Sequence, residues 1–376
     1  MADIGRRVKA AREALDYTQE ELARAVGLNR EAVVNIEGGR RKVKADELWA
    51  IARELETPMV HFLQDLPRMS LAVVEARRGE ATTREARRAE LWLRRHFDDY
   101  QQLLRVLGRD GTPNVSLDWP EAGAIVDGAR RAADAQRSQH RLGNRPIPDL
   151  REHLEDDVRV PVFGRAVRDT DFCGMLLLEH RASAAAMLVN AELLTSRRNF
   201  TMAHEYGHLL WKLRRKEATA DVFYRHPAET EEEMFANAFA AQFLAPDDAI
   251  RENAAQLNVS AGRPDSVARL AASYGVSFQM MTYRLQNLGL LLAPDAEDLR
   301  RTIRPADLPS FRRERQAFYA ISPLHWDLVL EAYSSDELDA ARCGEMVDQS
   351  ALEFEELIDD LGAELVSETA LSAAAG

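Results

Sequence analysis

Length, composition and charge exclude several classes of protein. The chain has 376 residues, more than one hydrophobic core usually supports, so we expect two or three domains. Hydrophobic residues make up 46% and charged residues 30%, and the net charge of −13 argues against non-specific coating of nucleic acid, although one local basic patch is permitted.

The chain also carries none of the usual signs of membrane insertion or export. No apolar run approaches the roughly 18 residues of a membrane span, and the N-terminus lacks the apolar core of a signal peptide. Cys173 and Cys343 lie far apart and form no C-x-x-C motif, as expected of thiols in a reducing compartment. We therefore expect a cytoplasmic protein with no membrane partner.

Residues 4–64 have the pattern of a bundle of short helices. The sequence Thr18-Gln-Glu-Glu21 is a capping box that opens one helix, and Gly27 ends it. Asn29 caps the next helix, which runs to about Glu37. Two helices joined by a short turn containing glycine are typical of a helix-turn-helix.

The sequence from Thr18 to Gly39 resembles the XRE (phage Cro/repressor-like) helix-turn-helix family, and we place this domain at residues 1–66. The resemblance implies that the helix after Asn29 lies in the major groove of a double-stranded DNA operator. It implies contacts to bases, phosphates or the DNA backbone from Gln19, Asn29, Arg30, Glu31, Asn35, Arg40, Arg41 and Lys44. A helical protein-interaction module is the alternative: Glu31 and Glu37 favour it, whereas the Arg-Lys loop at 40–44 favours DNA.

Residues 67–145 indicate a helical connector. A long helical pattern covers residues 83–107, and another helix starts at Pro120. Trp92, Phe97 and Leu104 supply an apolar surface that is typical of a core or of a dimer seam. We expect a homodimer, because helix-turn-helix proteins commonly pair on DNA.

From Asn144 onward the pattern changes from helical to mixed. Three short apolar runs, at residues 158–163, 172–178 and 184–190, predict the strands of a small sheet. The third run ends immediately before the most distinctive segment of the chain, residues 196–213. A sheet edge beside that segment could hold an extended peptide by main-chain hydrogen bonds.

The segment at 196–213 predicts a helix that binds a metal. His204 and His208 are four residues apart, so they share one helix face and can hold one zinc ion, with Glu205 directed at its water. Gly207 in mid-helix costs about 1 kcal/mol relative to alanine, which suits a place where substrate or another backbone approaches closely. A chance occurrence of H-E-x-x-H is the alternative, and the apolar helix around the motif favours the metal site.

A second helix, predicted at residues 228–246, offers acidic candidates for a third metal ligand. The spacing does not choose among them, and an acidic first turn favoured by the helix dipole explains most of them. The candidates are Glu229, Glu231, Glu232 and Glu233.

The block at residues 146–290 resembles the ImmA/IrrE family of metallopeptidases. Matching stretches are Arg197-x-x-Phe-Thr-Met-Ala-His-Glu-Tyr-Gly-His208, Glu233-x-x-Ala-Asn-Ala-Phe-Ala-Ala-Gln-Phe-Leu-Ala-Pro246 and residues 267–289. The resemblance implies a zinc endopeptidase with His204, His208 and Glu233 as ligands and Glu205 as catalytic base. Arg197 and Tyr206 are candidates for contacts to the substrate or to the ligands, although Tyr206 stands where the family usually has leucine. The segment at 267–289 resembles a second small helix-turn-helix-like unit that packs on the peptidase core.

Residues 291–376 form an acidic region with short helical patterns at 326–333, 335–346 and 351–361. This region could be a solvated face, a dimerisation element or an internal mimic of the DNA backbone, and the sequence does not choose among these roles.

The predicted fold class is thus α+β and mainly helical, with a helix-turn-helix bundle, a helical connector, a zincin-like domain with a small sheet and a helical C-terminal region. The predicted function is a DNA-binding transcriptional regulator whose zinc-dependent endopeptidase domain cuts a protein substrate, a repressor being one candidate. A regulator whose peptidase-like fold only senses a metal or ligand is the first alternative. An antitoxin or phage-type repressor is the second.

Overall fold

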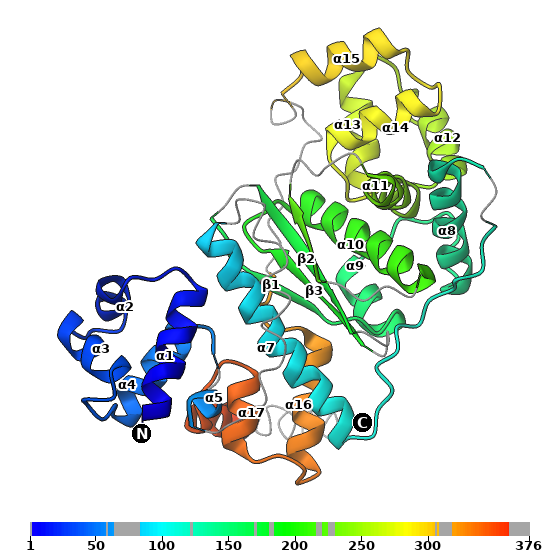
Figure 1. Cartoon of the computed structure of the whole chain (residues 1–376). Helices are drawn as coiled ribbons and strands as arrows, with labels where there is room; N and C mark the ends of the chain where they lie inside the picture. Colours follow the sequence, from blue (N-terminus) through cyan, green and yellow to red (C-terminus); the bar gives the residue numbers. More distant parts are fainter. Residues whose placement is uncertain are drawn as a thin grey trace. The chain divides into compact units, whose positions relative to one another are not determined.

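A computed structural model describes residues 2–57, 59–63, 83–120, 123–168, 171–179, 184–215, 220–224, 230–304, 307 and 318–360 (Figure 1). The predicted fold class is confirmed, since the described residues are mainly helical with one small sheet. The chain divides into two compact units. We call Met1–Asp110 with His325–Gly376 the terminal unit, and Gly111–Leu324 the central unit. Across the described ranges, no helix is both long enough and apolar enough to cross a lipid bilayer.

The N-terminal part of the terminal unit is a bundle of short helices. They are α1 (Ala2–Ala14), α2 (Gln19–Ala25), α3 (Arg30–Glu37), α4 (Ala45–Glu54) and α5 (Met59–Leu63). The predicted capping box is confirmed, because Thr18 Oγ1 accepts from the Glu21 amide at 3.1 Å and Glu21 Oε2 accepts from the Thr18 amide at 2.8 Å. Asn29 Oδ1 caps α3 by accepting from the Ala32 amide at 2.8 Å.

Helix α7 (Arg84–Val106) packs against this bundle through a row of arginines. Arg84 donates to Glu21 Oε1 at 3.0 Å, and its guanidinium lies 4.7 Å from the centre of the Tyr17 ring. Arg88 pairs with Glu54 at 3.1 Å and with Glu56 at 3.2 Å. Helix α7 is therefore part of the same unit as the helices that precede it.

The acidic C-terminal region returns to α7. It contains α16 (Pro323–Ser334), α17 (Ala340–Met346) and a helix at residues 351–360. Arg342 pairs with Asp99 of α7, and Asp348 pairs with Arg95 and accepts from Trp92 Nε1 at 2.8 Å. Part of the acidic region therefore supplies structural partners to α7 instead of a solvated face. Trp92, Phe97 and Leu104 are all buried within the chain.

The central unit contains a four-stranded sheet in the order β1-β3-β2-β4. Strand β1 (Val162–Arg165) runs parallel to β3 (Ala185–Asn190), and β2 (Phe172–Leu178) runs antiparallel to both of its neighbours. The first strand begins later than predicted, because the amides of Val158 and Val160 bond back to the preceding turn. Strand β4 (Ala220–Tyr224), which follows the motif helix, was not predicted.

The motif helix α10 (Thr195–Arg215) packs on β2 and β3 and is covered by α11 (Glu231–Leu244), which packs in turn on α8 (Ile125–Gln139) (Figure 1). Gly207 makes this packing close, since a Cβ there would lie 2.8 Å from Ala236 Cα. The prediction that another backbone approaches Gly207 is therefore confirmed.

Further helices complete the same core. They are α9 (Leu150–Glu152), the π-helix η1 (His153–Asp157), α12 (Asp247–Gln256), α13 (Pro264–Ser273), α14 (Phe278–Asn287) and α15 (Ala293–Thr302). Helices α13 and α14 bury Val267, Leu270, Met281 and Leu285 in the core that also contains α10 and α11. This is the packing that the resemblance implied for residues 267–289.

The last segment of the central unit runs beside strand β1. The Gly164 amide donates to Ala320 O at 2.9 Å, so residues 318–321 lie against the edge of that strand. Arg151 donates to Tyr319 O at 3.2 Å and to Glu155 Oε1 at 3.0 Å, and Glu155 Oε2 accepts from the Leu324 amide at 3.0 Å. The buried ion pair between Arg151 and Glu155 thus holds the last residues of the central unit in place.

Candidate metal centre

Three side chains from α10 and α11 converge on one point. His204 Nε2 and His208 Nε2 lie 2.9 Å apart. Glu233 places Oε2 at 3.2 Å from His204 Nε2 and Oε1 at 3.3 Å from His208 Nε2. Both histidines are buried and Glu233 is half-buried, so the three form a group that could hold a metal ion.

The outer nitrogens of both histidines are fixed by hydrogen bonds. His204 Nδ1 lies 3.1 Å from Asn237 Oδ1, and His208 Nδ1 lies 2.8 Å from Glu232 Oε1. Both partners are acceptors, so each Nδ1 carries a hydrogen, and a ring that holds no second proton turns its Nε2 lone pair inward. When both rings are neutral, two lone pairs and a carboxylate meet, an arrangement that is unfavourable without a cation and suits a divalent metal. The donor set therefore fits the zinc ion that the sequence predicts.

The charges at the site differ between the two histidines. Burial lowers the pKa of His204 to about 4. Burial would also lower the pKa of His208, but its hydrogen bonds to Glu232 and Glu233 outweigh this and raise it to about 10. Burial acts to raise the pKa of Glu233, yet the contacts with both histidines bring it down to about 2. In the absence of a metal, His208 therefore carries a proton that a metal ion would displace.

Glu205, the predicted base, lies beside the histidines and next to strand β2. It is fully buried. A Cβ on Gly174 of β2 would lie 3.7 Å from Glu205 Oε1 and only 2.6 Å from Thr201 Cγ2. The glycine therefore lets β2 approach α10 at the level of the Glu205 carboxylate.

The structure separates the acidic candidates for a third ligand. Glu233 faces both inner nitrogens, whereas Glu232 contacts the outer nitrogen of His208 and Glu231 is exposed. Glu229 lies outside the described residues. The helix begins after Thr230, whose hydroxyl accepts from the Glu233 amide at 3.2 Å and so fixes the first turn.

Tyr206 and Arg197 lie in different surroundings. Tyr206 is fully buried, its hydroxyl donates to Gln136 Oε1 of α8 at 2.9 Å, and its ring packs on Phe239 and Phe243. Its side chain therefore belongs to the hydrophobic core of the central unit. Arg197 donates to Cys173 Sγ at 3.2 Å, beside Gly174 on β2.

Two residues that matter for this geometry were missed from the sequence. Asn237 orients His204, and Lys212 binds Glu232 with its Nζ atom 3.0 Å from Glu232 Oε2. A signal for both exists in the sequence: Lys212 follows His208 by four residues, and Asn237 follows Glu233 by four. That spacing places each of them on the same helix face as its ligand.

The predicted DNA-contacting residues divide into exposed and internally bound groups. Asn29, Arg30, Glu31, Arg40 and Lys44 are exposed, and Asn35 is half-buried. Arg41 donates to Glu47 at 2.6 Å, and Gln19 donates to Glu37 Oε2 at 2.8 Å.

The sequence suggested that the charge of Glu37 disfavours DNA binding, but the structure removes this objection. It is buried, and it forms an ion pair with Arg12 at 2.6 Å. Its charge is therefore compensated inside the bundle.

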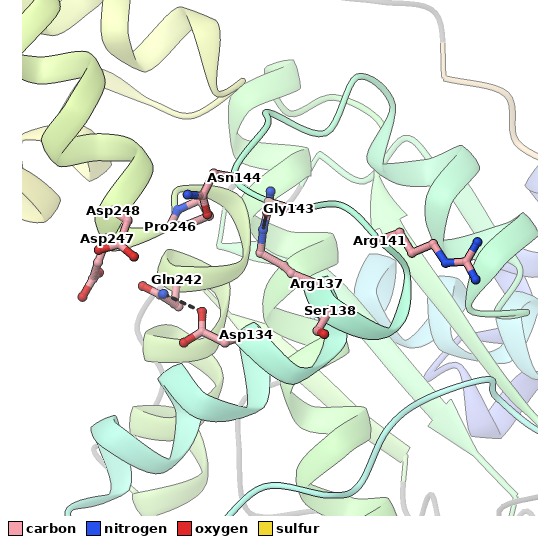
Figure 2. Close-up of a pocket in the computed structure, with 10 residues that line it drawn as sticks. All are labelled: Asp134, Arg137, Ser138, Arg141, Gly143, Asn144, Gln242, Pro246, Asp247 and Asp248. Carbon is pink, nitrogen blue, oxygen red and sulfur yellow. Dashed lines mark hydrogen bonds between the residues drawn. The ribbon is translucent and has the colours of Figure 1, made fainter.

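The central unit also has a hollow of about 640 Å³ that contains none of the three converging side chains (Figure 2). Gln242 donates to Asp134 Oδ1 there at 2.7 Å, and the Arg137 guanidinium donates to main-chain carbonyls such as Gly143 O at 2.8 Å. Its lining consists of Asp134, Arg137, Ser138, Arg141, Gly143, Asn144, Gln242, Pro246, Asp247 and Asp248. Because Gln242 and Arg137 are engaged within the protein, we assign no function to the hollow.

Comparisons with known proteins match both regions. Residues 8–62 match the family model described as Helix-turn-helix, and residues 163–286 match the model described as IrrE N-terminal-like domain. An uncharacterized transcriptional regulator in the ATPase CF(0) region of Rhodospirillum rubrum is 39% identical over 67 residues. That match spans 18% of this chain and 62% of the relative, less than two thirds of its length.

A solved structure, Bacillus thuringiensis PlcR in complex with the peptide PapR7 and DNA, aligns with 90% of this chain and 98% of its own. The identity is 11% and the TM-score 0.18, so this likeness carries no argument. The family models support a chain that joins a helix-turn-helix domain of the XRE type to an IrrE-like domain.

Proposed function

We propose that this chain, which joins a helix-turn-helix domain to an IrrE-like domain, is a DNA-binding transcriptional regulator with a zinc-dependent endopeptidase centre. The observation that carries the proposal is the convergence of His204, His208 and Glu233, with both outer histidine nitrogens already bonded. The substrate would be a regulatory protein, such as a repressor, in which a peptide bond is hydrolysed.

The proposed chemistry assigns distinct tasks to the side chains. His204, His208 and Glu233 would hold Zn²⁺ through Nε2, Nε2 and a carboxylate oxygen. Zinc bound in this way supplies a water of lowered pKa and polarises a peptide carbonyl. Glu205 would accept a proton on its carboxylate and deliver it to the leaving amine. Its burial beside Gly174 keeps bulk water away from that proton transfer.

Metal content and peptide hydrolysis together test this centre. The wild type should bind about one zinc per chain, and His204→Ala and Glu233→Ala should lose it. Glu205→Gln should keep the metal and lose hydrolysis, because it retains the shape of the side chain without its basicity. Equal hydrolysis by wild type and Glu205→Gln would overturn the assignment of the base. Metal binding without hydrolysis would instead favour the sensor function.

The DNA-binding part of the proposal rests on the exposed start of α3. Asn29, Arg30 and Glu31 are exposed there, and Arg40 and Lys44 are exposed in the loop that follows. Helix α3 would enter the major groove of an operator and the loop would contact the backbone. We include in this proposal that two copies of the chain bind the operator as a homodimer. Sedimentation of the protein–DNA complex would test this by giving the number of chains per operator.

A further inference from the structure

Beyond the three converging ligands, a chain of charged contacts leads outward from His208. His208 Nδ1 lies 2.8 Å from Glu232 Oε1, and Lys212 Nζ lies 3.0 Å from Glu232 Oε2 and 2.9 Å from Glu232 Oε1. The Lys212 side chain is only 8% exposed and that of Glu232 is 23% exposed. A lysine so thoroughly withdrawn from water requires a partner, and Glu232 provides it.

The two helices present these groups by their regular spacing. His204, His208 and Lys212 follow one another at intervals of four residues on α10, so they occupy successive turns of one face. Helix α11 opposes that face with Glu232 and Glu233 in its first turn. One carboxylate therefore reaches the inner nitrogen of His208 while its neighbour reaches the outer one.

His204 has a different partner. Its Nδ1 faces the neutral amide oxygen of Asn237 at 3.1 Å, and Asn237 is exposed. Water can replace an exposed amide as an acceptor, whereas a carboxylate that is also paired with an ammonium accepts a stronger, charge-assisted hydrogen bond. The two histidines are thus oriented by contacts of unequal strength.

We propose that Lys212 and Glu232 are positioning residues for metal binding, acting through His208 as a Lys212–Glu232–His208 relay. The inference rests on the proposed function, since it requires that the centre binds a metal. Glu232 holds the hydrogen of His208 on Nδ1 and increases the donor strength of Nε2. Lys212 holds the Glu232 carboxylate in place with its Nζ atom 3.0 Å from Oε2, so that the carboxylate points at His208 and does not turn inward as a competing ligand.

The test is the affinity of the full-length protein for Co²⁺ and Zn²⁺, measured by cobalt absorption and by competition with a chromogenic chelator. Glu232→Gln should weaken binding by about 10- to 100-fold. Glu231→Gln removes the same charge from the exposed neighbouring position and should bind like wild type. Asn237→Ala should weaken binding less than Glu232→Gln does. Equal affinities for Glu232→Gln and wild type, or a greater loss in Asn237→Ala, would overturn the relay.

Lys212 is tested by rescue and by non-additivity. Lys212→Met should weaken metal binding and change the cobalt spectrum, whereas Lys212→Arg should restore both. The double variant Lys212→Met/Glu232→Gln should bind no more weakly than Glu232→Gln alone, because the lysine acts through the carboxylate. If Lys212→Met lowers only the unfolding free energy and leaves metal affinity unchanged, the lysine is merely structural and the proposal fails.

These outcomes separate the relay from the metal centre itself. A wild type that binds neither metal refutes the centre and the relay together. A wild type that binds metal, beside a Glu232→Gln variant of equal affinity, refutes the relay alone.

Discussion

Gly207 of α10 faces Ala236 of α11 so closely that an added Cβ would lie 2.8 Å from Ala236 Cα. Gly207 is next to His208, and Ala236 lies one turn after Glu233. The distance between the two helices at this point therefore determines whether the carboxylate of Glu233 reaches the histidines.

The first prediction concerns this contact. Gly207→Ala should push α11 outward and weaken zinc binding by about tenfold or more, because sub-ångström displacement of one ligand degrades the site. Intrinsic helix propensity would favour alanine by about 1 kcal/mol, so a helix-only effect has the opposite sign. Zinc affinity by chelator competition checks the prediction. An affinity equal to that of wild type would show that the helices can separate without cost to the site.

The second prediction concerns the ion pair that fastens the end of the central unit. Glu155→Gln should lower the free energy of unfolding by about 3 kcal/mol, because it leaves the buried Arg151 without its ionic partner. Burial also raises the pKa of Glu155, although Arg151 opposes the effect. Urea unfolding measures the loss. Glu152→Gln, an exposed change in the same turn, should have almost no effect, and similar losses in both variants would contradict the prediction.

The third prediction is a pH dependence of the terminal unit. Burial lowers the pKa of His325 to about 4, whereas an unfolded histidine has a pKa near 6.5. Between these values the unfolded chain binds more protons than the folded one, so stability is present above pH ~6.5 and is lost as the pH falls towards ~4. The slope should approach ~1.4 kcal/mol per pH unit for this one group.

Amide hydrogen exchange in α16 and α17 measures this effect. His325 donates to Met346 O at 3.1 Å, and His325→Gln keeps a donor there without titrating in this range. The variant should therefore show a smaller loss of protection on acidification. His96, whose pKa burial also lowers, still contributes in that variant. Equal pH dependence in both proteins would contradict the role of His325.

The fourth prediction separates base reading from backbone contact in the DNA-binding region. Arg30→Ala or Asn35→Ala should weaken binding to the specific operator by about 1–3 kcal/mol. Arg40→Ala or Lys44→Ala should weaken binding to all sequences and reduce its salt dependence. Arg41→Ala should have a smaller effect on the salt slope, because Arg41 is already paired with Glu47. Fluorescence anisotropy at several salt concentrations provides the measurement.

The fifth prediction is that the two units are coupled. An operator titration with wild type and Glu205→Gln, each with and without zinc, should give different DNA affinities with and without the metal. The reason is that a ligand shifts a conformational equilibrium only through unequal affinity for its states. Equal DNA affinity in all four samples, with no proteolytic fragment on a gel, would indicate two independent modules.

Local patterns were predictable from the sequence because their causes are local. The Thr18 capping box, the long helix after Thr83 and the shared face of His204 and His208 depend on residues within one or two turns. The spacing of residues alone could not decide which of Glu231, Glu232 and Glu233 faces the two histidines. That depends on how α11 is rotated and how closely it approaches α10.

Other features depend on partners that are distant in the sequence. The core position of Tyr206 is set by Gln136, and the neutralisation of Glu37 is set by Arg12. Strand β4 exists through its pairing with β2, and its own short sequence gives a weak signal. The pairing of Arg342 with Asp99 joins residues more than two hundred positions apart, which no periodicity reveals.

The return of the C-terminal region to α7 has a consequence for biosynthesis. A ribosome makes α7 long before α16 and α17, because the whole central unit is translated between them. During that interval Trp92, His96 and Asp99 lack the groups that later cover or pair with them, namely Asp348, His325 and Arg342. A nascent or truncated chain would therefore expose this side of α7 and be a target for chaperones and proteases.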